Sequence, residues 1–334
     1  MNQNRIFGIF ILFILLNMSQ VMGTSPYDID GNGVVDIKDL EKIGLHFNEL
    51  VNSYPGPDVG GNGMVDILDM VFVTKHLGEI TPKPIFNGDF ENGTWSPPWT
   101  TSCNGDDDFQ DFSIVTNPVR QGNYSAKIRV DSTSYCGGTT GNRFELLSST
   151  FTDLKSEREG DEYWYAMSMM LDPSWTSAST DTGFHIFTQW HGPTRLSPEL
   201  ALNIWNTGGR PSFGYTMCTG NSPATPTSTS NCDYRTNEIF ISPVEKNVWY
   251  DFLLHVKWTT SSTGYVEIWT KKYTEATYTQ LVDLHNVPTL QKITGETSMV
   301  ASRHIGLYRS EGYPDTDILY FDKYKMGTTR DSVT

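Results

Sequence analysis

The 334-residue sequence has little positive charge and no cluster of it. It contains 24 Lys and Arg residues against 39 Asp and Glu residues, which gives a formal net charge of -15. This composition argues against a nucleic-acid-binding protein, because neutralising phosphates requires clustered Lys and Arg. Charged residues make up only 19% of the chain and aromatic residues 13%. We therefore expect a folded protein with an ample core, not a disordered one.

Long apolar runs are also missing. The longest, Ile6 to Leu16, is shorter than the about 20 residues that a membrane-spanning helix needs. Arg5 precedes it, and small residues near Gly23 follow it, which predicts a secretory signal peptide over residues 1–23. We expect a mature protein that is secreted, extracellular or cell-surface associated, with no membrane span after cleavage. An uncleaved membrane anchor is the alternative, because the cleavage region lacks an A-x-A pattern.

Several common site motifs do not occur. There is no C-x-x-C pair for a thiolate zinc site, no G-x-S-x-G nucleophile turn and no glycine-rich phosphate loop. The chain has four cysteines, which are Cys103, Cys136, Cys218 and Cys232. In an exported protein we expect disulfides, and pairing of sequence neighbours is the simplest of the three connectivities. Free buried thiols are the alternative.

A twelve-residue loop occurs twice near the N-terminus. Oxygen ligands recur at positions 1, 3, 5, 9 and 12, with a backbone carbonyl at position 7 and Gly33 or Gly63 at the sharp turn. The first loop supplies Asp28, Asp30, Asn32, Val34, Asp36 and Asp39. The second supplies Asp58, Asn62, Met64, Asp66 and Asp69, and has Gly60 at position 3. This is the EF-hand arrangement, so the sequence predicts two Ca²⁺ loops, each followed by a short helix, with the second loop the weaker.

The repeated loops resemble the dockerin module of cellulosome-type enzymes, over about residues 26–80. The resemblance implies docking to a cohesin-bearing scaffold protein, with recognition positions at Ile37–Lys38 and Ile67–Leu68. A calcium-stabilised spacer without a cohesin partner is the alternative. We expect the module over residues 24–81 and a short linker over 82–84.

The rest of the chain, residues 85–330, is predicted to be mainly β. Segments of five to ten residues alternate in polarity and are separated by Gly, Pro, Asn, Ser and Asp. No long stretch has helical periodicity. We expect a two-sheet, concanavalin-like jelly-roll sandwich. The predicted strands are 125–131, 163–171, 185–191, 200–205, 250–258, 265–271, 303–309 and 318–326.

Alternation along three of these segments, and along residues 142–145, places polar side chains on one face of a strand. The expected face members are Arg143 with Glu145; His185, Phe187, Gln189 and His191; Asn203; and His304, Gly306 and Tyr308. Leu200, Leu202, Ile204, Ile305 and Leu307 are expected in the core. Any one such face also fits an ordinary solvated sheet surface.

The ordered patterns Arg143-Phe-Glu145, Gln189-Trp-His191 and Gly306-Leu-Tyr308 resemble the three signature strands of the jelly-roll polysaccharide lyases. The similarity spans about residues 85–327 and is greatest to glucuronan and heparin lyases. His304 stands where the family pattern often has Lys.

The resemblance implies β-elimination at a uronic acid, in which a carboxylate must be neutralised before the neighbouring proton is removed. Arg143, Gln189 and Asn203 would bind the carboxylate, and His304 would lie near the substrate. His191 would be the base and Tyr308 the acid, or Tyr308 both. The sparse positive charge favours a carboxylate-only polymer, such as glucuronan or alginate, over heparin.

Two other functions remain open from the sequence. A non-catalytic carbohydrate-binding protein would use aromatic side chains such as Trp190, Trp205 and Tyr308 as stacking platforms. A glycoside hydrolase is favoured less, because we find no alternating carboxylates on a strand of the kind that such an enzyme requires.

Overall fold

The computed structural model describes residues 25–30, 33–50, 56–80, 82–101, 111–135, 141–148, 156–176, 183–192, 197–222, 232–293 and 297–334. The chain divides into two compact units, Met1–Thr81 and Pro82–Thr334. The predicted signal peptide, Asn32, Cys103 and Cys136 lie outside the described residues. In the described part, no helix is both long and apolar enough to cross a membrane.

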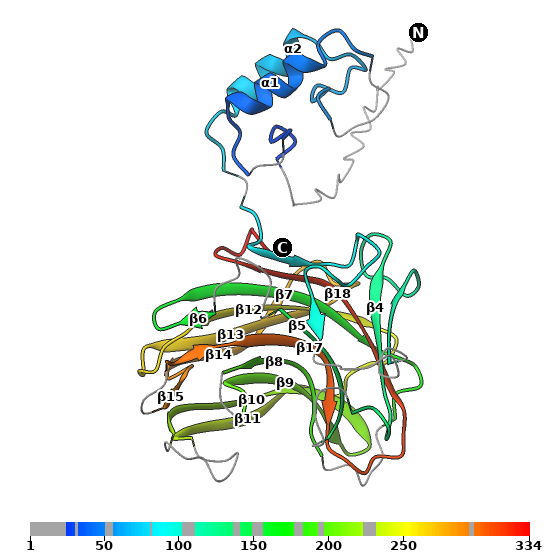
Figure 1. The fold of residues 1–334 in the computed structure, drawn as a ribbon, viewed down its shortest axis with the longest axis vertical. Coiled ribbons are helices and arrows are strands. Elements are labelled where there is room, and N and C mark those ends of the chain that lie inside the picture. The colour runs from blue at the N-terminus through cyan, green and yellow to red at the C-terminus, as the bar shows by residue number, and fades with distance from the viewer. Residues whose placement is uncertain are drawn as a thin grey trace, which may run out of the picture. The chain divides into compact units, whose positions relative to one another are not determined.

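The first unit contains two helices of equal length, α1 (Ile37–Leu45) and α2 (Ile67–Lys75) (Figure 1). Asp36 and Asp66 are their N-caps, and each forms a reciprocal capping box with the Asp three residues later. The acidic loop residues therefore also start the helices. A small core of four buried side chains, Val35, Ile43, Val65 and Val73, comes equally from the two repeats.

The second unit is a sandwich of two eight-stranded sheets (Figure 1), as predicted. Sheet A has the order β14-β13-β12-β7-β18-β4-β3, with β1 beside β18. Its strands are β1 (Phe86–Gly88), β3 (Phe112–Val115), β4 (Ser125–Val130), β7 (Glu162–Leu171), β12 (Trp249–Lys257), β13 (Gly264–Lys272), β14 (Thr279–Val287) and β18 (Asp317–Gly327).

Sheet B has the order β11-β10-β9-β8-β17-β5-β2, with β15 beside β10. Its strands are β2 (Thr100–Thr101), β5 (Asn142–Leu147), β8 (His185–His191), β9 (Leu200–Thr207), β10 (Arg210–Ser222), β11 (Tyr234–Ile241), β15 (Gln291–Ile293) and β17 (Ser302–Arg309). A separate pair joins β6 (Glu157–Arg158) and β16 (Met299–Val300).

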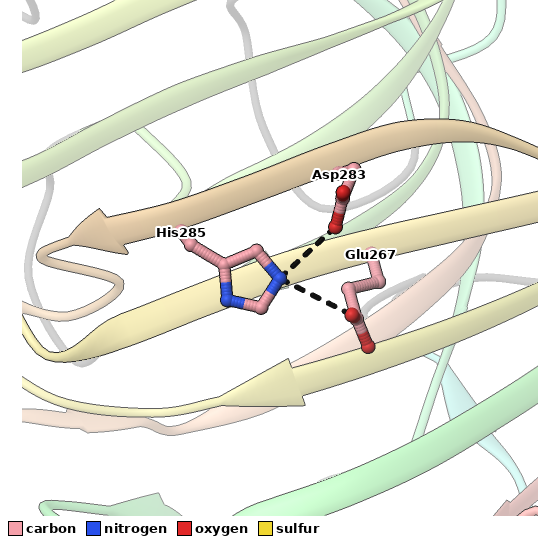
Figure 2. Close-up of side chains that lie close together, drawn as sticks. All are labelled: Glu267, Asp283 and His285. Carbon is pink, nitrogen blue, oxygen red and sulfur yellow. Dashed lines mark hydrogen bonds and ion pairs between the residues drawn. The ribbon is translucent and has the colours of Figure 1, made fainter.

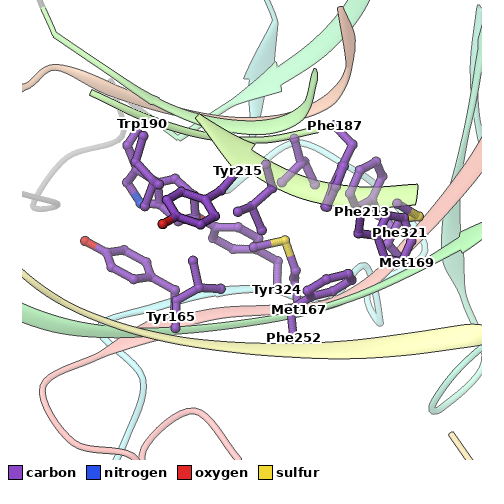
Figure 3. Packing of buried hydrophobic residues seen from close by; sticks show 14 of the residues in the cluster. Tyr165, Met167, Met169, Phe187, Trp190, Phe213, Tyr215, Phe252, Phe321 and Tyr324 are labelled. Atoms are coloured by element: carbon purple, nitrogen blue, oxygen red, sulfur yellow. The ribbon is translucent and has the colours of Figure 1, made fainter. Parts of the chain in front are cut away.

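The core lies between the two sheets and is rich in aromatic side chains. Figure 3 shows Phe187, Trp190 and Phe213 of sheet B facing Met167 and Phe252 of sheet A. The large apolar area buried here is the main term that stabilises the sandwich. Each sheet therefore has one face turned into the core and one turned away from it.

All eight predicted strands are present, with ends that differ by at most two residues. One predicted face is wrong. Phe187 does not share a face with Gln189, but packs in the core against Phe213 and Phe252. His185 is also buried on the inner side, 3.6 Å from Asp317 of sheet A. The register shifts next to Phe187 in both strand pairs that involve β8. In the pair with β17 the shift lies between Ile305 and Tyr308, and in the pair with β9 it lies between Ile186 and Thr188. Such a bulge moves the following residues to the opposite face.

The second unit also contains a disulfide between Cys218 and Cys232. This is one of the two sequence-neighbour pairs expected from the sequence. It joins β10 to the residues just before β11, so it closes the segment between two paired strands.

Candidate active site

The four strands singled out in the sequence are neighbours in sheet B, in the order β9-β8-β17-β5. Across them, Tyr308 pairs with Arg143, Gly306 with Glu145, and His304 with Gln189. The expected core residues of β9 and β17 are all buried in the main core. The polar residues that alternate with them therefore lie on the face of sheet B that is turned away from the core. We call these residues the row: Arg143, Glu145, Gln189, His191, His304 and Tyr308.

Glu145 is at the centre of this row. The Gln189 side-chain amide donates to Glu145 Oε1 at 2.5 Å, and His304 Nδ1 lies 3.4 Å from Glu145 Oε2. Burial acts to raise the pKa of Glu145, but the charge and hydrogen bond of His304, the Gln189 amide and Arg143 together leave that pKa below its ordinary value. Glu145 is therefore a buried anion that fixes the side chains of two predicted site residues.

Arg143 and Tyr308 form the second contact of the row. The guanidinium carbon of Arg143 lies 4.4 Å from the centroid of the Tyr308 ring, and the ring of Phe184 meets the same tyrosine edge-on at 4.9 Å. Arg143 Nε is buried and has no hydrogen-bond partner among the described residues. The row thus contains a cation next to a phenol, and one buried donor of that cation has no partner among the described residues.

Position 306, in the third signature strand, has no room for a side chain. Its φ of 151° lies at the edge of the region that favours glycine. A Cβ atom there would lie 2.2 Å from the carbonyl oxygen of Phe144 and 2.8 Å from Glu145 Cα. Any side chain would therefore push β17 away from β5 and disrupt the row between His304 and Tyr308.

His191 lies at one end of the row. Its Nδ1 is 2.8 Å from the carbonyl oxygen of Gly192, which can only accept, so Nδ1 carries the proton of the neutral ring. Burial lowers the pKa of His191, and the charge of His304 acts in the same direction. His191 is thus held neutral, with Nε2 as the nitrogen that can accept a proton.

Both nitrogens of His304 are, by contrast, already engaged. Nε2 is 2.7 Å from Ser302 Oγ, and Nδ1 lies near Gln189 and Glu145. The rings of His191 and His304 are 6.3 Å apart. Of the two histidines, His191 has the nitrogen better placed to act as a base.

The row has a measurable length. His191 pairs with Ser302, which is six residues from Tyr308, so the backbones of His191 and Tyr308 are separated by roughly 20 Å of strand. The two predicted proton-transfer residues share a face but lie at its two ends, with His304 and Glu145 between them. Two groups that act on the same sugar would have to turn their side chains toward each other over the middle of the row.

Asn203 is level with the Tyr308 end of the row, because both residues pair with Ile186. Its side chain is buried, and its Nδ2 donates to the Ala201 carbonyl at 3.2 Å and lies 3.3 Å from Thr216 Oγ1. Asn203 is therefore two strands away from Tyr308 and is already held by its own neighbours.

Two residues that the sequence did not single out as site residues belong to this region. Glu145 was recognised only as part of a pattern, although its place two residues after Arg143 on the same face was a usable signal. Glu199 is buried and accepts from the Gly192 backbone amide at 2.6 Å, so it supports the turn that follows His191. Burial raises the pKa of Glu199 to about 8. No sequence pattern marked this second residue.

In the first unit, the first acidic loop brings Asp28, Asp30 and Asp39 together, with one oxygen of each within 4.8 Å of the others. Asp28 Oδ1 is buried and has no hydrogen-bond partner among the described residues. Asp39 Oδ1 accepts from the backbone amides of residues 29 and 30. An unpaired buried oxygen beside two other carboxylates fits a hard cation such as Ca²⁺.

The second acidic loop repeats this backbone arrangement with fewer oxygens. Asp69 Oδ1 accepts from the Gly60 amide at 2.8 Å, and Asp58 accepts from the amides of Asn62 and Gly63. Gly60 has no side chain to contribute where the first loop has Asp30. The donor set of the second loop therefore fits the same ion less well.

Comparison with known proteins identifies the family of this chain. The polysaccharide lyase family profile matches residues 90–325. No curated protein matches the chain significantly. Among solved structures, the endo-β-1,4-glucuronan lyase of the fungus Trichoderma reesei is 17% identical, with a TM-score of 0.54, and the match covers 75% of this chain and 98% of that one.

Two further structures are more distant. The marine alginate lyase of Aplysia kurodai is 12% identical with a TM-score of 0.48, over 74% of this chain and 100% of that one. A β-glucanase catalytic domain from Podospora anserina is 15% identical with a TM-score of 0.44, over 73% and 92%. At such identities the structural likeness concerns the fold alone, whereas the family match covers most of the chain. The expectation of an enzyme is confirmed, and the chain belongs to the polysaccharide lyase family.

Proposed function

We propose that this lyase cleaves a uronic-acid-containing polysaccharide, glucuronan-like or alginate-like, by β-elimination at the row on sheet B. The observation that carries the proposal is the contact of Arg143 with Tyr308 on the same face as the Glu145–Gln189–His304 cluster. This arrangement combines donors for a carboxylate with two groups that can transfer a proton. A protein that only binds sugars would need neither transfer group.

Arg143 and Gln189 are the proposed carboxylate-binding groups, and Asn203, on the strand next to that of Gln189, is the third proposed donor. The Arg143 guanidinium has a buried Nε without a hydrogen-bond partner among the described residues. Gln189 Nε2 donates to Glu145, and its second proton has only a long contact, at 3.4 Å, to His304 Nδ1. Donors aimed at the carboxylate stabilise the negative charge that develops when the neighbouring carbon loses its proton. This stabilisation must be in place before the proton can be removed.

In the proposed reaction, His191 Nε2 removes the proton from C5 of the uronate. The electron pair of that C–H bond forms the C4–C5 double bond, the C4–O bond breaks, and Tyr308 donates its phenolic proton to the leaving oxygen. Each positioned proton-transfer group typically contributes about 10²–10⁴ in rate. His304, held by Glu145 and Ser302, is the proposed contact for the sugar between these two ends.

The charge of the row supports a polymer that carries carboxylates but no sulfates. Arg143 is its one permanent cation, and the other basic groups are the titratable rings of His191 and His304. A sulfated chain would require a denser cluster of Arg and Lys.

The first unit is proposed to be a dockerin-like calcium module of a secreted enzyme. Asp28, Asp30, Asn32, Asp36, Asp39 and the carbonyl of Val34 would hold the first ion, and Asp58, Asn62, Asp66, Asp69 and the carbonyl of Met64 the second. The bound ions would supply the charge that holds each loop around its helix start. The unpaired Asp28 Oδ1 supports this assignment.

Exposed apolar side chains support docking to a cohesin-bearing scaffold. Ile37 and Ile67 occupy equivalent places at the two helix starts and are 63% and 60% exposed. Leu68, where the first repeat has Lys38, is 52% exposed. Apolar side chains kept in water at repeated positions are typical of an interaction surface. Binding of the purified chain to a panel of immobilised cohesins, with Ile37→Ser and Ile67→Ser as variants, tests this part of the proposal.

The lyase activity is tested by near-ultraviolet absorbance of the unsaturated uronate product, with glucuronan, alginate, hyaluronan and heparin as substrates. We expect turnover of glucuronan or alginate, and its loss in Tyr308→Phe and His191→Ala. The exposed Tyr273 and His46, replaced in the same way, are the matched controls. Wild-type rates in both site variants would refute the assigned roles.

A further inference from the structure

We propose that Glu267, Asp283 and His285 form a binding site for one divalent transition-metal ion, with Zn²⁺ as its representative, on sheet A. Glu267 belongs to β13, and Asp283 and His285 belong to β14. The residues on either side of Glu267, Val266 and Ile268, are buried in the core. Glu267 therefore points away from the core, on the face of the sandwich opposite to the lyase row.

The three side chains already converge on a single point. His285 Nε2 lies 3.0 Å from Asp283 Oδ1 and 3.2 Å from Glu267 Oε1, as Figure 2 shows. One ligand atom of each of the three residues lies within 4.8 Å of the others. Two ligands of a tetrahedral zinc ion with bonds of 2.0–2.1 Å are separated by about 3.3 Å. The two spacings from His285 Nε2 are close to this value, so small rotations of the side chains would admit the ion.

The strand register produces this convergence. The pairing of β13 with β14 shifts between Gly264 and Tyr265 and again between Ile268 and Trp269, on either side of Glu267. As a result, Glu267 pairs directly with Asp283. Bulges of this kind re-aim side chains and are frequent next to functional sites.

A second layer of side chains fixes the orientation of Glu267. Its other oxygen, Oε2, is 2.8 Å from His255 Nδ1, and His255 Nε2 is 2.8 Å from Glu162 Oε1. The His255 ring is stacked on Trp164 at 4.0 Å, so it cannot turn freely. Metal-binding carboxylates are commonly held in this way by a hydrogen-bonded outer layer, which orients the ligand before the ion arrives.

The local charge also calls for a cation. Two carboxylates share the single nitrogen His285 Nε2, which carries at most one proton for both. In the described part of the chain, no Lys or Arg forms an ion pair with Glu267 or Asp283, whose ion-pair partners are histidines. A divalent ion would neutralise both carboxylates together and use the nitrogen lone pair.

The donor set distinguishes this site from the calcium loops. Ca²⁺ takes six to eight oxygen ligands, whereas this site offers two carboxylates and one imidazole. Imidazole with carboxylates suits Zn²⁺ and its neighbours among the transition metals. The side chains of His285 and Asp283 are 45% and 67% exposed, against 18% for Glu267, so water can complete the shell. Because β14 is the edge strand of sheet A, the bound ion would clamp that edge to β13.

Calorimetric titration of ZnCl₂ into the untagged full chain tests the proposal. Millimolar Ca²⁺ is present throughout, so that the acidic loops of the first unit are occupied by the ion they prefer. We expect one equivalent of Zn²⁺ to bind, and its dissociation constant to rise about tenfold or more in His285→Gln and in Asp283→Asn. His255→Gln should weaken binding about tenfold through the loss of the outer layer.

His46→Gln is the matched control, because His46 is 46% exposed and pairs with Glu49 as His285 pairs with its carboxylates. It should leave the zinc affinity unchanged. Circular dichroism without zinc verifies that each variant is folded, and Asp283→Asn serves if His285→Gln is not. The absence of stoichiometric Zn²⁺ binding, or equal affinities in wild type and in the two ligand variants, would overturn the proposal. Both results are independent of lyase activity, which depends on the opposite face.

Discussion

The guanidinium of Arg143 lies over the ring of Tyr308, 4.4 Å from its centroid, and the two residues are direct partners across β5 and β17. In the proposed reaction Tyr308 gives its proton to the leaving oxygen, and this guanidinium lies where the resulting negative charge develops. The same guanidinium is the group proposed to bind the substrate carboxylate. Arg143 therefore links carboxylate binding to proton transfer.

Replacing Arg143 by Lys should lower kcat by about 10²-fold or more, because an ammonium group cannot stack on the ring and present planar donors together. The measurement is the initial rate of unsaturated uronate formation at saturating substrate. Arg330→Lys, at an exposed position near the C-terminus, is the control. A kcat for Arg143→Lys equal to that of wild type would contradict the proposed role.

The pH profile should show His191 as a base with a lowered pKa. Burial lowers that pKa below the ordinary value of 6.5, and the neutral ring is the active form. As pH falls, activity should therefore persist through 6.5 and be lost only below it. His191→Ala should reduce kcat by about 10²–10⁴ and remove this acid limb. A limb that survives in His191→Ala would assign the titration to another group.

The sequence predicted much of the fold because alternation in polarity records which face of a strand is buried. The order of the three signature patterns also predicted a common site, and the strands that carry them are neighbours. Alternation failed at Phe187, since a bulge changes the face without changing the residue pattern. A bulge depends on pairing with another strand, which a single segment does not encode.

The sequence pattern places Glu145 on the face of Arg143 but does not reveal its central role, and it gives no sign that Glu199 is buried. Glu145 is identified by what it holds, Gln189 and His304, which lie far away in the chain. Glu199 is a carboxyl with no cationic partner among the described residues, an arrangement that no composition or spacing reveals. Long-range contacts decide both.

Glu199 should make the fold more stable at acidic pH. Its folded-state pKa of about 8 lies above the ordinary 4.5, so between these values the folded chain keeps a proton that the unfolded chain has lost. The stabilisation is complete below pH 4.5 and is lost as pH rises through about 8, at no more than about 1.4 kcal/mol per pH unit.

Urea unfolding at pH 5, 6.5 and 8 measures this effect. Glu199→Gln keeps an oxygen for the Gly192 amide but cannot ionise, so its free energy of unfolding should fall less with pH than that of wild type. Glu275→Gln, at an exposed position, should retain the wild-type slope. Identical slopes for wild type and Glu199→Gln would show that Glu199 ionises normally in the folded protein.

The two acidic loops should bind calcium with different affinities, because the second lacks an oxygen at Gly60 where the first has Asp30. Calorimetric titration of the chelator-treated chain should resolve two classes of site. Asp28→Ala should abolish the tighter class, because it removes the buried, unpaired oxygen Asp28 Oδ1, and Asp58→Ala should abolish the weaker class. Glu41→Ala, on an exposed part of α1, should change neither. Loss of the weaker class in Asp28→Ala would reverse the order of the two loops and show that Gly60 does not set the affinity.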